Sequence, residues 1–168
     1  LRLGEICGLK RGDIDLEEKT ITVKRNIVRL RIHEGARKTK LVAATPKTEQ
    51  SRRTIPYPDV LHKTLEKVCR GKEGEDYLFG QTGRVFLNPK TLTMRYYKVL
   101  EEGGLRSVSF HTLRHTFATR CIEGEMDVKT LSEILGHSSV KMTLERYVHS
   151  TMDFKKEQIN KVYDNIQF

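Results

Sequence analysis

The sequence predicts an α+β fold that is mainly α-helical, with a small antiparallel β-sheet in its first third. Residues 20–57 contain three extended runs, the first of which alternates apolar and polar residues as a half-buried strand does. From Pro58 onward, apolar residues recur at helical spacing, and capping residues and glycines divide the chain into separate helices. With 168 residues, of which 37% are hydrophobic, the chain has the size of one globular domain.

The first elements predicted are a short helix and the sheet. Residues 1–10 have the pattern of the end of a helix, which closes between Gly8 and Gly12. Three extended runs follow, "TITVKRNIVRLRI", "TKLVAATP" and "RRTIPYP". We expect them to form one antiparallel sheet within residues 20–57, with basic side chains on the face that the core does not use.

The rest of the chain predicts a series of helices. Asn88 is a suitable N-cap with Pro89 at the first helical position, and glycines such as Gly103 and Gly124 mark helix ends. The predicted helices are "PDVLHKTLEKVCRG", "NPKTLTMRYYKVLEEGG", "SFHTLRHTFATRCIEG", "DVKTLSEILGH", "SSVKMTLERYVH" and "DFKKEQINKVYDNI".

The last predicted helix has an apolar face at the end of the chain. Its apolar residues follow helical spacing: Phe154, Ile159, Val162 and Ile166. A compact chain does not need so apolar a face at its end, so we expect this helix to dock on another surface.

The net charge of +9 is concentrated in one segment. From Lys24 to Arg53 the chain has ten Lys or Arg residues against Glu34 and Glu49, which gives this segment a charge of +8. One cationic segment in a nearly neutral remainder is typical of a surface that binds a polyanion, and we expect it to contact nucleic acid. The alternative interpretation is that this segment is a charged surface in contact with solvent, with no binding partner. A basic segment of this kind gives affinity for a polyanion, but it does not indicate a catalysed reaction.

The composition excludes several classes of protein. No run of about eighteen apolar residues is present to span a membrane, and no charged-then-apolar signal segment opens the chain. Cys7, Cys69 and Cys121 are far apart and set in apolar helical patterns, so we expect free, buried thiols in a reducing compartment. The first residue is Leu1, and its neighbours look like the middle of a helix. We therefore interpret the chain as a fragment without its upstream part.

Four of the six histidines lie between residues 111 and 149. His111 and His115 are four residues apart, so a helix would place both on one face, as zinc-binding helices do. The metalloprotease form of that motif requires Glu directly after the first His, where this chain has Thr112. Arg114 also suits a phosphate better than a metal, because guanidinium presents a planar fork of donors. The segment therefore predicts anion binding.

The segment "HTLRHTFAT", then "LGHSS" and a tyrosine ten residues past His137, resembles the catalytic box of the tyrosine recombinases, the phage integrase family. Upstream, "LRLGEICGLKRGDID" is similar to the first box of that family and supplies Arg2 and Glu5. The stretch "TPKTEQSRRTIP" is similar to its β-hairpin lysine segment and supplies Lys47. The resemblance covers nearly the whole chain and is closest to integrases of conjugative transposons and prophages. It implies the catalytic-domain fold of these DNA breaking-rejoining enzymes.

The resemblance implies how a phosphodiester would be cut. The reaction requires a nucleophile, charge stabilisation on two non-bridging oxygens, and a proton for the leaving 5′ oxygen. Tyr147 is the expected nucleophile, and its attack on phosphorus gives a 3′-phosphotyrosine link. Arg2 and Arg114 are expected to hold the oxygens, and Lys47 to protonate the leaving group.

The histidines and a glutamate complete the expected site. His111 is expected to exchange the tyrosine proton, and His137 to hydrogen-bond the phosphate. Glu5 and His115 are expected to support their neighbours, Glu5 by orienting Arg2 or His111. Taken singly, each of these residues has a plainer role in packing, capping or surface solvation. Only their joint order favours a recombinase site.

The resemblance also implies partners and surroundings. Family members act on double-stranded DNA as four-protomer assemblies, some with accessory DNA-bending or excision factors, and they need no metal and no other cofactor. We expect a bacterial or phage protein that acts on DNA in the cytoplasm, without membrane contact. Residues 1–168 would form its catalytic domain, with the upstream DNA-binding domains absent. The last helix would dock on a neighbouring protomer, or fold back on its own domain when the protein is alone.

Two other classes of protein stay open. A type IB topoisomerase has nearly the same active site and works as a monomer, although the "LGH" to tyrosine spacing and the short length do not favour it. A non-enzymatic helix-turn-helix regulator could be formed by "DVKTLSEILGHSSVKMTLERYV". That interpretation leaves Arg2, Lys47 and Arg114 unexplained.

Overall fold

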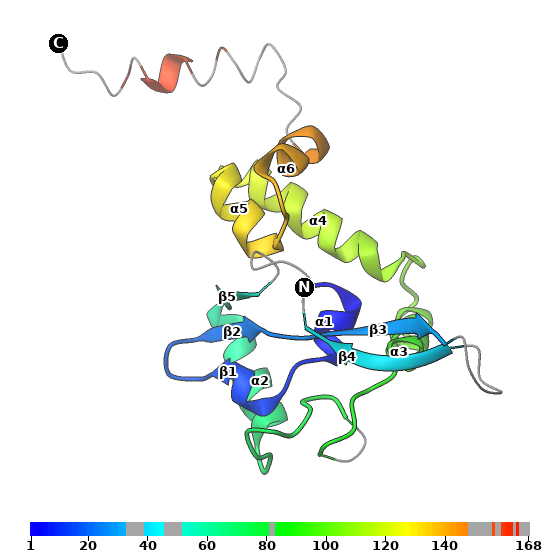
Figure 1. The fold of residues 1–168 in the computed structure, drawn as a ribbon. Coiled ribbons are helices and arrows are strands. Elements are labelled where there is room, and N and C mark those ends of the chain that lie inside the picture. The colour runs from blue at the N-terminus through cyan, green and yellow to red at the C-terminus, as the bar shows by residue number, and fades with distance from the viewer. Residues whose placement is uncertain are drawn as a thin grey trace.

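The computed structural model describes residues 1–32, 39–45, 52–80, 83–147, 156, 159–162 and 164, with residues 146 and 147 described for the backbone only. Figure 1 shows two parts, one above the other. The lower part contains the strands and the helices α1 (Leu3–Cys7), α2 (His62–Cys69) and α3 (Pro89–Glu102). The upper part contains α4 (Phe110–Glu123), α5 (Val128–Leu135) and α6 (Val140–Tyr147). The predicted α+β class, mainly helical with little sheet, is confirmed.

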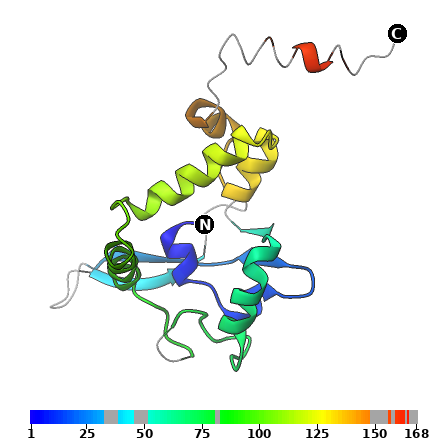
Figure 2. The ribbon, with the colours of Figure 1, turned by 180° about the vertical axis from the view of Figure 1, so that it is seen from behind.

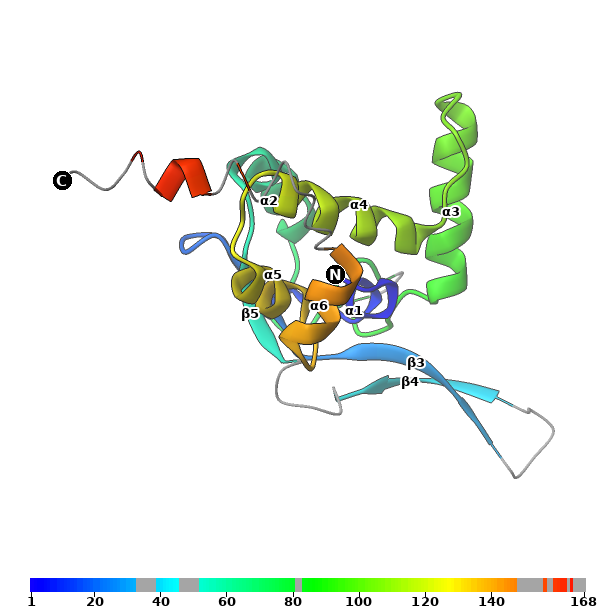
Figure 3. The same cartoon turned by 90° about the horizontal axis from the view of Figure 1, so that it is seen from above.

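The strands form two antiparallel sheets rather than the single sheet predicted. The first has the order β1-β2-β5 and consists of β1 (Ile14–Asp15), β2 (Thr20–Val23) and β5 (Arg53–Pro56), with Ile21 opposite Ile55. The second is a hairpin of β3 (Asn26–Arg31) and β4 (Thr39–Ala44), with Val28 opposite Val42. In Figure 3 this hairpin extends away from α5 and α6.

The run predicted as one strand is divided at Lys24 and Arg25, and the cause lies upstream. Both side chains turn to the buried carboxylate of Asp13, which ends the short helix η1 (Arg11–Asp13). Lys24 Nζ lies 3.2 Å from Asp13 Oδ1, and Arg25 Nη1 lies 2.7 Å from Oδ2. The chain therefore leaves the first sheet at this point and begins the hairpin.

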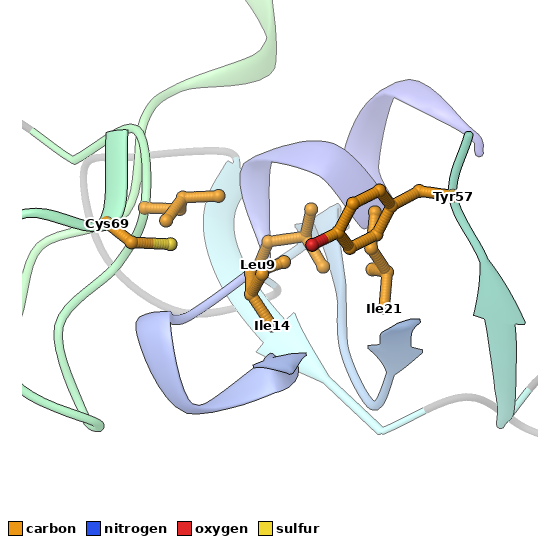
Figure 4. Close-up of a cluster of buried hydrophobic side chains, with 6 residues drawn as sticks. Leu9, Ile14, Ile21, Tyr57 and Cys69 are labelled. Atoms are coloured by element: carbon orange, nitrogen blue, oxygen red, sulfur yellow. The ribbon is translucent and has the colours of Figure 1, made fainter. Parts of the chain in front are cut away.

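A hydrophobic core fills the lower part between the first sheet and α2. Figure 4 shows its side chains, which come from the turn after α1, the first sheet and its flanks, the end of α2, and a turn between α2 and α3: Leu9, Ile14, Ile21, Tyr57, Cys69 and Leu78. Seen from behind in Figure 2, α2 covers this sheet. A second, separate core lies in the upper part and is formed by Ala118, Leu131 and Leu135. The two parts thus have their own apolar interiors.

The predicted helix boundaries are confirmed where local caps define them. Asn88 Oδ1 accepts a hydrogen bond from Lys90 N at 3.0 Å at the start of α3, and Gly103 is the C-cap. Asp127 caps α5 in the same way. The α2 helix is preceded by one turn, η3 (Asp59–Leu61), which lies inside its predicted range.

The last predicted helix falls largely outside the described residues, as do Phe154 and Ile166. Residues 156, 159–162 and 164 have helical backbone, and the side chains of Ile159 and Val162 are exposed. Lys161 forms an ion pair with Glu125 at the end of the turn after α4. Docking of this segment on another protomer stays a prediction.

All three cysteines are free thiols, as predicted. Cys7 and Cys69 are buried, and Cys121 is partly buried. Burial raises the pKa of the Cys7 thiol to about 11. Over the described ranges, no helix is long and apolar enough to cross a membrane.

Candidate active site

Three arginines meet at the carboxyl end of α5. Each of three consecutive carbonyl oxygens accepts a hydrogen bond from a different arginine: Ile134 from Arg53 Nε at 2.8 Å, Leu135 from Arg114 Nη2 at 2.6 Å, and Gly136 from Arg2 Nη2 at 3.0 Å. The last carbonyls of a helix have no partner within the helix and carry the negative end of its dipole. Guanidinium groups therefore suit this position. Segments more than one hundred residues apart in the chain converge here.

Glu5 joins two of these arginines. Arg53 approaches it with both ends of its fork, Nη1 to Oε1 at 3.1 Å and Nη2 to Oε2 at 3.0 Å. Arg2 donates its Nη1 to Oε1 at 2.9 Å and its backbone N to Oε2 at 2.7 Å. Glu5 is only 3% exposed. Of the two partners expected for Glu5, Arg2 is in contact, and Arg53 is a further partner that the sequence did not predict.

The electrostatics of this cluster keep Glu5 ionised. Burial on its own would raise the pKa of the carboxyl, but the hydrogen bonds and charge of Arg53, together with the hydrogen bonds of Arg2, lower this pKa to about 2. The cluster combines three guanidinium groups with one carboxylate, so it keeps an excess of positive charge. Such a cluster is suited to an anion with several oxygens, such as a phosphate.

The helical spacing of α4 places Arg114 in the cluster. Arg114 and Ala118 are the buried residues of this helix and lie one turn apart on its inner face. Ala118 belongs to the upper core, while Leu113 and Phe117 point outward and are exposed. The guanidinium of Arg114 is therefore fixed where the upper core ends and the arginine cluster begins.

His137 links the end of α5 to α6. Its Nδ1 lies 2.8 Å from Thr143 Oγ1, and both residues are buried. His137 directly follows Gly136, which ends α5 in the left-handed region with φ +65°. Position 147 lies one turn beyond Thr143 at the end of α6. The backbone of α6 is thus tied to the loop beside the arginines.

Two of the remaining predicted residues lie in the first turns of α4, and the others lie outside the described residues. His111 and His115 contact each other in the first turns of α4, with ring centroids 4.3 Å apart and rings perpendicular. Their shared helix face agrees with the i, i+4 spacing. Lys47 and the side chain of Tyr147 lie outside the described residues. Among the residues that the structure describes, no three His, Cys, Asp or Glu side chains gather in a way that could hold a metal ion.

Arg53 is the member of the cluster that the sequence did not predict. The sequence places it in the basic segment expected to contact nucleic acid, but its side chain is only 7% exposed. The alternation along the strand could have indicated that Arg53 points inward. Arg53 and Ile55 share the inward face of β5, while Thr54 and Pro56 are exposed.

The basic segment is therefore less exposed than its charge suggested. Lys24 and Arg25 are bound to Asp13, and Arg53 to Glu5. The exposed cations of the segment that the structure describes are Arg29, Arg31, Lys40 and Arg52.

The sequence and the fold have counterparts in known proteins. The chain belongs to the phage integrase family, whose model matches residues 1–153. It is 37% identical over 165 residues to a tyrosine recombinase XerC-like protein of Caldanaerobacter subterraneus subsp. tengcongensis, covering 89% of this chain and 42% of that protein. It is 28% identical over 170 residues to the transposase from transposon Tn916 of Enterococcus faecalis, covering 91% of this chain and 40% of that protein.

Solved structures show the same fold. The Tn1549 transposon integrase, in complex with a circular intermediate DNA, superposes with a TM-score of 0.76 at 24% identity, over 96% of this chain and 54% of that one. The XerA recombinase superposes with a TM-score of 0.62 at 26% identity, over 99% and 54%. The predicted tyrosine recombinase catalytic-domain fold is confirmed. The chain spans about two fifths of the length of these curated relatives and about half of these solved chains.

Proposed function

We propose that this chain is the catalytic domain of a site-specific DNA recombinase, which cuts and rejoins DNA strands through a 3′-phosphotyrosine intermediate on Tyr147. The observation that carries the proposal is the position of Arg2 and Arg114. These two residues are far apart in the chain, yet they bind adjacent carbonyls beside His137. Two guanidinium groups next to an imidazole form a site for the non-bridging oxygens of one phosphodiester.

The proposed reaction exchanges one phosphodiester for another. The hydroxyl oxygen of Tyr147 attacks phosphorus while His111 takes its proton, and the bond from phosphorus to the 5′ oxygen breaks. Lys47 gives the leaving 5′ oxygen a proton. Arg2 and Arg114 stabilise the negative charge that develops on the non-bridging oxygens. Attack by a second 5′ hydroxyl on the phosphotyrosine reverses these steps, so that no energy source is consumed.

The link between His137 and α6 supports the choice of Tyr147. Thr143 holds α6 against His137, and position 147 follows one helical turn later on the same side of that helix. A nucleophile at position 147 would be held, through α6 and Thr143, to the loop that contains His137 and lies beside the proposed phosphate-binding arginines. The distance between nucleophile and phosphate would then be set by one short helix.

Double-stranded DNA is the proposed substrate. The relative solved as the Tn1549 integrase was in complex with DNA, and the described hairpin exposes Arg29, Arg31 and Lys40. We further propose that several protomers assemble on DNA, that accessory factors assist them, and that DNA-binding domains precede residues 1–168 in a longer protein. A bacterial or phage protein acting in the cytoplasm fits these proposals.

The test is covalent attachment to DNA. A nicked suicide substrate lets the short cleaved strand diffuse away, so the phosphotyrosine adduct accumulates and survives denaturing electrophoresis. The wild-type protein should form the adduct, and Tyr147→Phe should bind DNA equally well and form none. Tyr97→Phe is the matched control, because Tyr97 lies on α3 and is exposed, and it should react like the wild type. If Tyr147→Phe still forms an adduct, a residue other than Tyr147 is the nucleophile.

The same substrate separates the two other classes of protein. A helix-turn-helix regulator would form no adduct with any variant. A type IB topoisomerase would form the adduct and relax supercoiled DNA, but it would not join strands from two duplexes. Recombinant products from two differently labelled duplexes are therefore the result that the proposal requires.

A further inference from the structure

We propose that Arg53 is a positioning residue for strand cleavage, which orients Arg2 through Glu5 and fixes the end of α5 that carries His137. This inference rests on the proposed function. Arg53 starts β5 in the first sheet, and its side chain connects three elements, β5 with α1 through Glu5 and β5 with α5 through Ile134. Because this side chain is almost fully covered, its charge acts inside the protein rather than on the surface.

The first path runs from Arg53 to Arg2. Glu5 Oε1 accepts hydrogen bonds from the Nη1 atoms of both arginines, at 3.1 Å from Arg53 and 2.9 Å from Arg2. The side chain of Arg2 is 39% exposed, whereas those of Glu5 and Arg53 are almost fully covered. The covered pair therefore holds the more exposed arginine in place. Without Arg53, Glu5 and Arg2 could turn together toward solvent.

The second path runs from Arg53 to the loop after α5. Arg53 Nε donates to the carbonyl of Ile134 at 2.8 Å. The same guanidinium lies against Gly136, where an added Cβ would be 2.7 Å from Nη1. The position of this group thus limits the path of the chain between Leu135 and His137. Both paths end at residues that the proposed mechanism places on the phosphate.

The geometry of the contacts requires arginine and not merely a positive charge. Nε points to the carbonyl of Ile134 while the two Nη atoms point to the two oxygens of Glu5. A lysine has one ammonium group, which cannot span these directions at once. Arg53→Lys therefore keeps the charge and loses the orientation. Misplacement of a catalytic group by about 1 Å can reduce a rate by about 10²-fold.

A neutral substrate distinguishes positioning of Arg2 from general damage. In a methylphosphonate, a methyl group replaces one charged non-bridging oxygen of the scissile phosphate, so less negative charge develops during cleavage. A variant that has lost the effect of a guanidinium should recover most of its rate on this substrate. A variant with a loosened fold should be impaired equally on both substrates.

The experiment compares single-turnover cleavage of both substrates at saturating protein, in the complete protein. Arg2→Ala should lose activity on the phosphodiester and recover it on the methylphosphonate. Arg53→Lys should show the same pattern, with a loss of about 10²-fold on the phosphodiester and DNA affinity close to wild type. Glu5→Gln interrupts the same path and serves as the second variant where Arg53→Lys does not fold.

Arg25→Lys is the matched control. Arg25 also binds a buried carboxylate through two hydrogen bonds, but that carboxylate is Asp13, which belongs to η1 and not to the cluster at the end of α5. Arg25→Lys should lower the stability of the fold. Any loss of cleavage rate that it causes should be the same on the methylphosphonate as on the phosphodiester. Wild-type rates for Arg53→Lys, or an equal loss on both substrates, would overturn the inference while leaving the proposed function intact. A wild-type rate for Arg2→Ala on the phosphodiester would instead overturn the proposed site itself.

Discussion

Gly136 lies against the guanidinium of Arg53 so closely that no side chain fits between them. A Cβ at residue 136 would be 2.7 Å from Arg53 Nη1 and 2.9 Å from its Cζ. The backbone φ of Gly136 is +65°, in the left-handed region that favours glycine. Two independent requirements therefore act on this one position. They explain why a glycine separates the core residue Leu135 from the buried His137.

Substitution of this glycine should damage both stability and cleavage. Gly136→Ala introduces left-handed strain of roughly 1–2 kcal/mol and also displaces Arg53. The matched control is Gly104→Ala, because Gly104 has φ +60° but nothing within 4 Å of an added Cβ. Urea unfolding should show reduced stability in both variants, with the larger reduction in Gly136→Ala. Only Gly136→Ala should slow adduct formation, and equal rates for the two variants would contradict the contact with Arg53.

The ionised state of Glu5 predicts a pH-dependent contribution to stability. Its pKa is lowered from an ordinary 4.5 to about 2, so the folded state binds this proton less readily than the unfolded state. The contribution, on the order of 3 kcal/mol, is complete above about pH 5 and disappears as the pH falls toward 2.

The measurement is the difference in free energy of unfolding between wild type and Glu5→Gln from pH 7 to pH 3. The wild type should be more stable at pH 7, and this difference should shrink as the pH falls. Other carboxylates with lowered pKa values, such as Asp127, are present in both proteins and cancel. A difference that stays constant across this range would show that the charge of Glu5 does not stabilise the fold.

The exposed cations of the β3–β4 hairpin should supply DNA affinity. Replacing Arg29, Arg31 and Lys40 by Gln should weaken binding and reduce the slope of log affinity against log salt by about 0.9 for each phosphate that the protein no longer neutralises. The control replaces three exposed cations of α2 and its end, Lys63, Lys67 and Arg70. The α2 helix covers the first sheet and lies away from the hairpin (Figure 2). Equally weakened binding in the two triple variants would mean that the hairpin is not the DNA-binding surface.

Cleavage should not depend on a divalent metal ion. The proposed site neutralises the phosphate with Arg2, Arg114 and Lys47, where many phosphoryl-transfer enzymes use bound metal. Adduct yield in excess EDTA should therefore equal the yield in buffer. Loss of the adduct in chelator, with recovery on adding zinc or magnesium, would contradict the roles proposed for His111 and His137.

Local signals account for what the sequence predicted well. The start of α3 follows from Asn88 and Pro89, and the end of α5 from Gly136, because caps and glycines act within a few residues. Motif order then placed Arg2, Glu5, Arg114 and His137 in one site by resemblance, and these four residues are connected through the end of α5 in the structure.

Long-range contacts account for what the sequence did not predict. A basic residue in a basic segment looks the same whether it is exposed or buried. The burial of Arg53 depends on Glu5, 48 residues earlier, and on Ile134, 81 residues later. The division of the first predicted strand depends in the same way on Asp13, which binds Arg25. None of these three partners lies within the range of strand or helix periodicity.

The contacts at the end of α5 also determine when the site can form during synthesis. Arg2 reaches a carbonyl 134 residues later in the chain, and Arg53 one that is 81 residues later. Loops of this length close only after their entropy cost is offset by other contacts, so we expect both apolar cores to form before the arginine cluster. A growing chain on the ribosome holds Arg2, Glu5 and Arg53 long before α5 has been translated. A nascent chain that ends before residue 136 would therefore have no assembled arginine cluster.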